Sequence, residues 1–110
     1  MALGRRNPSR ATLAVLAAFL EDGDAELYGL EVCQLARLPS GSLYPILARL
    51  EQANVLSSRW EKDEEAARHP GRRRRYYRLT PTGLAYAAAE VRSARAELGW
   101  QVVPGLGGAT

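Results

Sequence analysis

Apolar residues recur at every third or fourth position in the first half of the chain, the period of helices with one buried face. The first such segment begins near Ser9, a helix-capping residue type that follows Pro8. Its apolar positions are Leu13, Leu16, Ala17 and Leu20, widened by Val15 and Phe19. A helix that is apolar around so much of its circumference needs burial on more than one side. We expect it at the centre of the domain or against a second subunit.

A second helix is predicted over roughly residues 27–37, and a third follows after a short connection. The apolar stripe of the second helix consists of Tyr28, Val32 and Leu35, adjoined by Leu30. This helix ends before Pro39, because the residue that precedes a proline is disfavoured in helical conformation. Two helices joined by so short a turn form a helix-turn-helix unit.

The third helix separates an apolar face from a small, smooth one. Its core-facing residues, at the spacing i, i+3, i+4 and i+7, are Leu43, Ile46, Leu47 and Leu50. The outward-facing residues are Gly41, Ser42, Tyr44, Pro45, Ala48 and Arg49. Because proline is tolerated in the first turn, Pro45 predicts that the regular helix starts near Ser42 as its cap. Small residues and the free amide groups at a helix start allow a phosphate to approach closely. For Tyr44 two roles stay open: contact with DNA, or packing at the edge of the core.

Two later segments alternate with the period of half-buried strands. Between Val55 and Glu61, Leu56 and Trp60 share one face, and Ser57 and Arg59 share the other. In the second strand, residues 74–79, the natural inward pair is Tyr77 and Leu79. The intervening segment contains the turn signal Pro70-Gly71 and is long for a plain hairpin. We interpret it as a wing.

The last predicted helix opens at Thr80-Pro81, with threonine as the cap and proline at the first helical position. Five of its residues follow the three-four spacing of a coiled-coil seam and are the predicted dimer interface: Leu84, Ala87, Val91, Ala94 and Leu98. The alternative is that this helix packs back on its own domain. Gly99 is expected to end the helix, and residues 99–110, which include Trp100, are expected to be a disordered tail.

Composition narrows the class of protein. A chain of 110 residues with 46% hydrophobic residues is expected to fold as one globular unit, and no apolar run approaches the length of a membrane span. Cys33 is the single cysteine, which excludes an intrachain disulfide and favours the cytoplasm. We find no nucleophile with a base, no paired carboxylates and no set of metal ligands around His69, so we expect neither an enzyme nor a cofactor nor a metal site.

The net charge of +3 is unevenly distributed along the wing. Acidic residues collect in its first half, at Glu61, Asp63, Glu64 and Glu65, and arginines collect over residues 68–78. The planar fork of arginine suits phosphate and guanine better than a lysine does. We therefore expect the acids to face solvent and Arg68, His69 and residues 72–75 to contact DNA. The alternative is a merely solvated loop.

In combination, these motifs resemble the PadR family of bacterial transcriptional regulators over roughly residues 10–95. The similarity lies in Tyr28-Gly29, Ser40-Gly41-Ser42-Leu43-Tyr44-Pro45-Ile46-Leu47, Arg49-Leu50-Glu51, Trp60-Glu61, Gly71-Arg72 and Tyr76-Tyr77-Arg78-Leu79-Thr80-Pro81-Thr82-Gly83. The resemblance implies a winged helix-turn-helix homodimer that represses promoters, with the last helix supplying the dimer contact. Some members release DNA when they bind small aromatic or drug-like ligands. Here Ser93-Ala94-Arg95 occupies the region where ligand-binding members place a tryptophan, so such an effector is less supported.

The predicted fold is mainly α with a small β-hairpin: a winged helix-turn-helix domain over residues 9–80, then a dimerisation helix over residues 81–98. The predicted DNA-binding residues are Ser40, Gly41, Ser42, Tyr44, Pro45, Arg49, Arg68, Arg72, Arg73, Arg74 and Arg75. We expect a homodimeric repressor on a pseudo-palindromic operator of double-stranded DNA. The alternative is a winged-helix module that binds an acidic protein partner.

Overall fold

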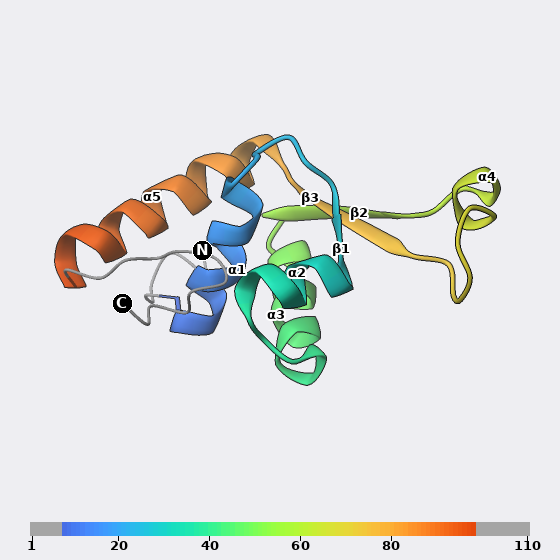
Figure 1. The fold of residues 1–110 in the computed structure, drawn as a ribbon. Coiled ribbons are helices and arrows are strands. Elements are labelled where there is room, and N and C mark those ends of the chain that lie inside the picture. The colour runs from blue at the N-terminus through green and yellow to red at the C-terminus, as the bar shows by residue number, and fades with distance from the viewer. Residues whose placement is uncertain (1–7, 99–110) are drawn as a thin grey trace.

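Five helices and three short strands make up residues 8–98, the part of the chain that this computed structural model describes (Figure 1). In chain order they are α1 (Arg10–Leu20), β1 (Leu27–Tyr28), α2 (Gly29–Ala36), α3 (Ser40–Gln52), β2 (Leu56–Trp60), α4 (Asp63–Ala66), β3 (Arg75–Leu79) and α5 (Pro81–Leu98). The hairpin of β2 and β3 extends away from the helices and carries α4 near its far end, while α5 extends in the opposite direction (Figure 1). No helix within residues 8–98 is both long and apolar enough to cross a lipid bilayer.

Helix α1 occupies the centre of the domain. It begins as predicted, because the hydroxyl of Ser9 accepts a hydrogen bond from the Thr12 amide at 3.1 Å. Helices α2, α3 and α5 all pack against α1. Val15, Leu16 and Phe19 are consequently almost completely buried. The wide apolar stripe of this helix is thus explained by neighbours on several sides within one chain.

The sheet has three antiparallel strands in the order β1-β3-β2, one more than the sequence predicted. Leu27 pairs with Tyr77 and Tyr28 pairs with Tyr76, so the residues expected to start the second helix form a short edge strand instead. Helix α2 begins at Gly29, where the Glu31 carboxylate accepts a hydrogen bond from the Tyr28 amide at 3.0 Å. A strand of two residues is too short to show an alternating pattern, which is why the sequence did not reveal it.

One face of the hairpin packs on the helices. Leu56, Tyr77 and Leu79 on this face are buried, as the alternation predicted. Trp60 lies on the same face as Leu56, but farther along β2, and its side chain is 55% exposed. The far part of the hairpin, the wing, therefore extends beyond the core. Its face that carries Trp60 is on the same side of the sheet as the helices.

Helix α3 presents its four predicted apolar residues to the core, but it starts earlier than expected. Leu43, Ile46, Leu47 and Leu50 are buried. The helix begins at Ser40 and is capped by the backbone of Pro39, so Pro45 lies inside it and Ser42 is not its cap. Pro45 removes a single hydrogen bond, to the carbonyl of Gly41, and Gly41 is exposed near the helix start, where water can reach that carbonyl. The proline is tolerated there for this reason.

Helix α5 begins as predicted. Thr80 precedes it and accepts a hydrogen bond on Oγ1 from the Gly83 amide at 2.8 Å, and Pro81 is its first residue. Three of the five predicted seam residues face inward: α5 packs against α1, and Ala87, Val91 and Ala94 belong to the buried core, while the side chain of Leu98 lies outside the described part of the chain. This corrects their assignment to a dimer interface, because side chains already covered by their own chain offer no surface to another. Leu84 remains 41% exposed.

Two predictions concern residues outside the described part of the chain: the helix stop at Gly99 and the disordered tail of residues 99–110. Helix α5 itself ends at Leu98.

Candidate nucleic-acid interface

The outer side of α3 is small, polar and exposed. Its exposed residues include all the predicted ones, Ser40, Gly41, Ser42, Tyr44, Pro45, Ala48 and Arg49, and also Gln52. A methyl group added to Gly41 would meet nothing within 4 Å. Within residues 8–98, the Arg49 side chain has no hydrogen-bond or ion-pair partner. A flat surface can thus approach the backbone of this helix closely, with the exposed guanidinium of Arg49 beside it.

Of the two roles that the sequence left open for Tyr44, the structure shows the packing role, and DNA contact stays a prediction. Its side chain is 47% exposed, and its hydroxyl lies over the first residue of α2. A Cβ atom built on Gly29 would be only 2.1 Å from the Tyr44 hydroxyl oxygen. Gly29 therefore makes room for Tyr44, which packs between α3 and α2 while remaining about half exposed.

Glu51 in the last turn of α3 joins this helix to both long strands of the wing. Its carboxylate accepts a hydrogen bond from the Ser58 hydroxyl at 2.5 Å and an ion-paired contact from Arg75 at 3.5 Å. The Arg75 guanidinium also lies 5.0 Å from the ring centroid of Trp60, a cation–π arrangement. Because side chains alternate along a strand, Ser58, Trp60 and Arg75 share the wing face on the α3 side. We call this the α3-facing side of the wing.

The opposite side of the wing holds a network of ion pairs and aromatic contacts. Arg59 bonds Glu26 at 2.8 Å and Glu65 at 2.9 Å. The hydrogen bond from Arg59 lowers the pKa of Glu65 to about 2, and likewise lowers the pKa of Glu26. Arg59 also lies 5.0 Å from the ring centroid of Tyr76. This arginine is thus engaged within the chain and faces away from α3.

Arg74 belongs to the same opposite side. Its guanidinium lies 4.2 Å from the ring centroid of Tyr28 in β1, and that ring meets Tyr76 edge to face. The structure therefore places Arg74, a predicted DNA contact, against the edge strand rather than on the α3-facing side.

The end of the wing departs most from the prediction, because one of its acids is buried. The Glu61 side chain is 2% exposed and accepts hydrogen bonds from the Arg74 amide at 2.7 Å and from His69 Nε2 at 2.9 Å. Arg73 donates to the Glu61 backbone carbonyl at 2.7 Å and to the Asp63 carboxylate at 2.9 Å. The expectation that the acids face solvent is thus wrong for Glu61, since a carboxylate can be buried once several donors satisfy it.

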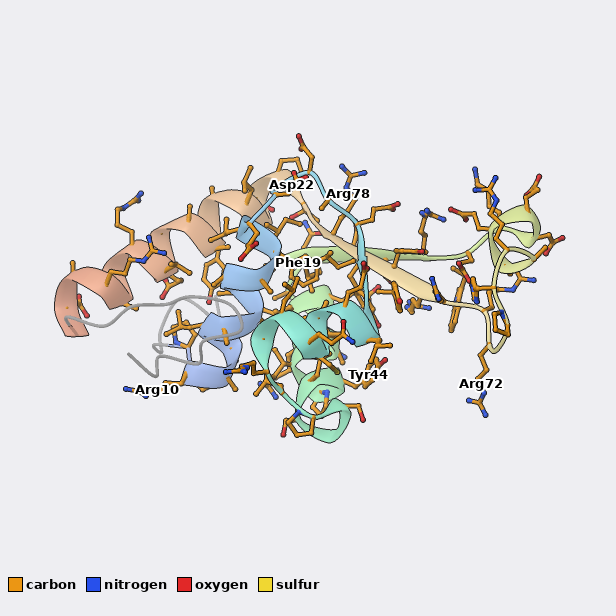
Figure 2. All side chains as sticks on the ribbon, in the orientation of Figure 1. Arg10, Phe19, Asp22, Tyr44, Arg72 and Arg78 are labelled. Atoms are coloured by element: carbon orange, nitrogen blue, oxygen red, sulfur yellow. The ribbon has the colours of Figure 1, made fainter. Side chains whose placement is uncertain are left out.

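Two wing arginines remain without such contacts. Arg68 and Arg72 are exposed, and within residues 8–98 neither side chain has a hydrogen-bond or ion-pair partner. Figure 2 shows Arg72 pointing from the wing to the side of the molecule on which α3 lies, and Arg78 pointing to the opposite side. The predicted wing arginines are therefore not equivalent: Arg72 is free and directed to the α3 side, while Arg73, Arg74 and Arg75 each hold part of the wing.

Sequence reasoning missed three residues of this surface: Trp60, Ser58 and Glu51. The alternation of β2 placed Trp60 on the correct face but could not show that β2 runs past the edge of the core. Glu51 and Ser58 are seven positions apart and meet only through the packing of α3 on β2. The contact between Glu51 and Ser58 had no sequence signal.

A helix-turn-helix followed by an antiparallel hairpin defines a winged helix-turn-helix protein. The sequence model of the family described as "Transcriptional regulator PadR-like family" matches residues 20–89, and the chain belongs to this family. The family is one of transcriptional regulators rather than of enzymes.

Solved structures agree with this assignment. The smu.1704 protein of Streptococcus mutans UA159 is 26% identical with a TM-score of 0.62, and the match covers 84% of each chain. A PadR-like transcription factor of Bacteroides fragilis is 27% identical with a TM-score of 0.59, over 82% of this chain and 86% of that one. A PadR family regulator of Clostridium difficile R20291 shares the fold at 22% identity, with a TM-score of 0.66 over 83% and 93% of the two chains. No curated protein matches the chain significantly.

Proposed function

We propose that this protein regulates transcription by binding duplex DNA through a single surface, formed by the outer side of α3 and the α3-facing side of the wing. The observation that carries the proposal is geometric. Arg72 points to the side of the molecule on which α3 lies (Figure 2), and the residues of α3 that are not buried are mostly small and exposed. A helix that fits a groove beside a cationic finger is suited to the edges and phosphates of a double strand.

The two parts of this surface have different tasks in the proposal. The first turns of α3 enter the major groove, where Ser42, Tyr44 and Arg49 are the side chains able to distinguish bases. Arg68 and Arg72 contact phosphates or the minor groove, which positions the protein without reading sequence directly. Arg75, held by Glu51 and Trp60, lies between the two parts.

The proposal includes a homodimeric repressor on a pseudo-palindromic operator, as in the family that the chain resembles. Two α3 helices then enter successive major grooves about 34 Å apart. The dimer contact cannot use the buried seam, so we assign it to the exposed side of α5, where Leu84, Ala85 and Ala89 are accessible. Alanines on that side allow two helices to approach closely.

The salt dependence of DNA binding tests the wing. If each subunit makes about three to five phosphate contacts, the logarithm of affinity falls with that of salt at a slope of roughly −5 to −9 for the dimer. Replacing Arg72 with alanine should weaken binding to all duplexes and reduce the slope by about 1 per subunit. Fluorescence anisotropy over a salt series measures both quantities.

Arg78 provides a control of the same charge, since it is exposed, directed to the opposite side (Figure 2) and donates to the Asp24 backbone carbonyl at 3.4 Å. Arg78→Ala removes the same charge and should leave the slope nearly unchanged. Equal slopes for wild type and Arg72→Ala would remove Arg72 from the contact surface. Tight binding to acidic peptides together with weak, sequence-blind attraction to DNA would instead favour the protein-interaction module.

A further inference from the structure

A buried ion pair closes the end of the wing. Glu61 follows β2, and its carboxylate meets His69 Nε2 at 2.9 and 3.1 Å, with the side chains only 2% and 14% exposed. The second ring nitrogen, Nδ1, lies 2.8 Å from the backbone carbonyl of Pro70. We call the contacts of His69 with Glu61 and Pro70 the wing clasp.

The geometry of the wing clasp requires a charged ring. A carboxylate and a carbonyl oxygen are both acceptors, so each ring nitrogen must donate, and only the imidazolium has two N–H donors. A neutral ring turns one nitrogen lone pair towards an oxygen, whichever tautomer it adopts. Loss of the proton therefore replaces one hydrogen bond of the wing clasp with a repulsive contact and removes the charge opposite a buried carboxylate.

The wing clasp holds the segment that carries the free arginines. Residues 67–74 connect α4 to β3 and include Arg68 and Arg72. The same segment is tied back at its far end, where the Glu61 amide donates to the Arg74 carbonyl at 2.8 Å and Glu61 accepts from the Arg74 amide. Residues 70–74 belong to no helix or strand. The contacts of His69 therefore hold the middle of this segment in place.

We propose that His69 is a positioning residue whose protonated side chain holds residues 67–74 in the conformation that directs Arg72 to DNA, so that wing order and DNA affinity fall as the ring loses its proton. The DNA part of this inference rests on the proposed function, while the protonation of the wing clasp does not.

The charged surroundings of His69 favour its charged form. The hydrogen bond to the Pro70 carbonyl, followed by that to Glu61, raises the pKa of His69 above its ordinary value, against partial burial and the positive charge of Arg74. Burial works to raise the pKa of Glu61, but the Arg74 amide and His69 outweigh it and lower the pKa overall. The other charged groups at this end are Asp63 and Arg73, which pair with each other, and Lys62 and Glu65, joined through the Lys62 amide. Glu64, Arg68 and Arg72 complete the set and are exposed to solvent.

The sign of the pH dependence follows from the raised value. A group whose pKa is higher in the folded than in the unfolded chain contributes stability below the unfolded value, about 6.5 for histidine, and loses it as pH rises through the folded value. The wing clasp is therefore complete at mildly acidic pH and opens at a pH above the ordinary titration range of histidine.

The titration of His69 tests the wing clasp without DNA. His69 is the sole histidine of the chain, so its ring proton signals in an NMR spectrum of an untagged protein need no assignment. We expect a midpoint above that of a histidine in an unstructured peptide, and a lower midpoint in Glu61→Gln. A midpoint at or below the peptide value in the wild type, or no change in Glu61→Gln, would overturn the inference.

The DNA arm of the experiment compares wild type with His69→Gln, which keeps a donor near the position of Nε2 but does not titrate. Between about pH 6 and about pH 9, wild-type affinity at constant salt should fall roughly threefold to tenfold, and that of His69→Gln should stay nearly constant. The same pH profile in both proteins would refute the positioning role. A raised midpoint of His69 in a protein that binds no duplex would uphold the clasp and refute the proposed function instead.

Discussion

At the level of single residues, Gly41 and Gly83 lack a side chain for different reasons. At Gly41 the missing side chain leaves the surface of α3 smooth, and at Gly83 it allows two segments of the fold to pack closely. Gly41 lies in the first turn of α3 with open space around its Cα atom. Gly83 lies in the first turn of α5, where an added Cβ would be 1.9 Å from the Val55 carbonyl oxygen. That oxygen also accepts the Thr80 amide at 3.0 Å, so it cannot move freely. The two glycines therefore make a matched pair for separating binding from stability.

Replacing each glycine with alanine should give opposite results. Gly83→Ala forces α5 away from the strand start and should destabilise the protein by about 1–3 kcal/mol, measured by urea unfolding. Gly41→Ala should leave stability unchanged or raise it by up to about 1 kcal/mol, because alanine is the better helix former. It should nevertheless weaken DNA binding, since a methyl group then stands on the face proposed to enter the groove.

Two findings would contradict this explanation. Full DNA affinity in a stable Gly41→Ala protein would mean that the start of α3 does not approach DNA closely. Unchanged stability in Gly83→Ala would mean that the α5 start is not held against Val55.

Among the elements, α3 and the wing are coupled through one carboxylate. Glu51 holds Ser58 of β2 and Arg75 of β3, and Arg75 in turn covers Trp60. In the proposed complex with DNA, a carboxylate at this position would compete with phosphate for the guanidinium of Arg75 and repel the DNA backbone. We therefore propose that the link orients the wing while limiting sequence-independent binding.

Glu51→Gln tests this link. The amide oxygen still accepts from Ser58, but the ion pair with Arg75 is lost, so unfolding free energy should change by less than about 1 kcal/mol. Released Arg75 becomes available to phosphate, and the salt slope should become steeper by about 1 per subunit, with a gain in affinity for nonspecific duplex. Asp22→Asn, which removes a carboxylate on the opposite side of the molecule (Figure 2), is the control and should leave the slope nearly unchanged. A slope that Glu51→Gln leaves unaltered would place Arg75 away from phosphates.

The elements with a long periodic pattern were predictable from the sequence, and the short or coupled ones were not. The buried faces of α3 and β3 follow from spacing alone, because Leu43 and Tyr77 fall on regular repeats. The edge strand at Leu27 has too few residues for any period. The early start of α3 was missed because the cost of Pro45 depends on whether the carbonyl that it leaves unpaired can reach solvent.

The same distinction holds for the candidate site: residues on a periodic pattern were predictable from the sequence, and individual contacts were not. The outward residues of α3 were identified because a helix that buries four apolar residues must expose the others. The wing arginines were recognised by composition, but their individual roles were not, since Arg73 pairs with Asp63 and Arg74 stacks on Tyr28 only in the folded chain. Contacts between distant segments leave no local pattern to read.

At the scale of the whole molecule, the buried part of the α5 seam faces its own domain, and we propose that the side of the protein formed by α3 and the wing binds DNA. Ala87 and Val91 are in the core, so the three-four spacing of this helix reflects its packing on α1. The exposed side of α5, with Leu84, is the surface that we propose for a second subunit. Its geometry sets the distance between the two α3 helices, and hence the spacing of half-sites on DNA.

Selection of bound sequences from a pool of random duplexes tests the central claim most directly, because it measures specificity, symmetry and spacing together. We predict enrichment of a pseudo-palindrome whose half-sites are centred about one helical turn, or about 10 base pairs, apart. The same selection with Gly41→Ala should recover that motif weakly or not at all. A pool that remains random after repeated rounds with the wild type, at a salt concentration where the protein still binds duplex, would contradict the assignment of α3 and the wing as a sequence-reading surface.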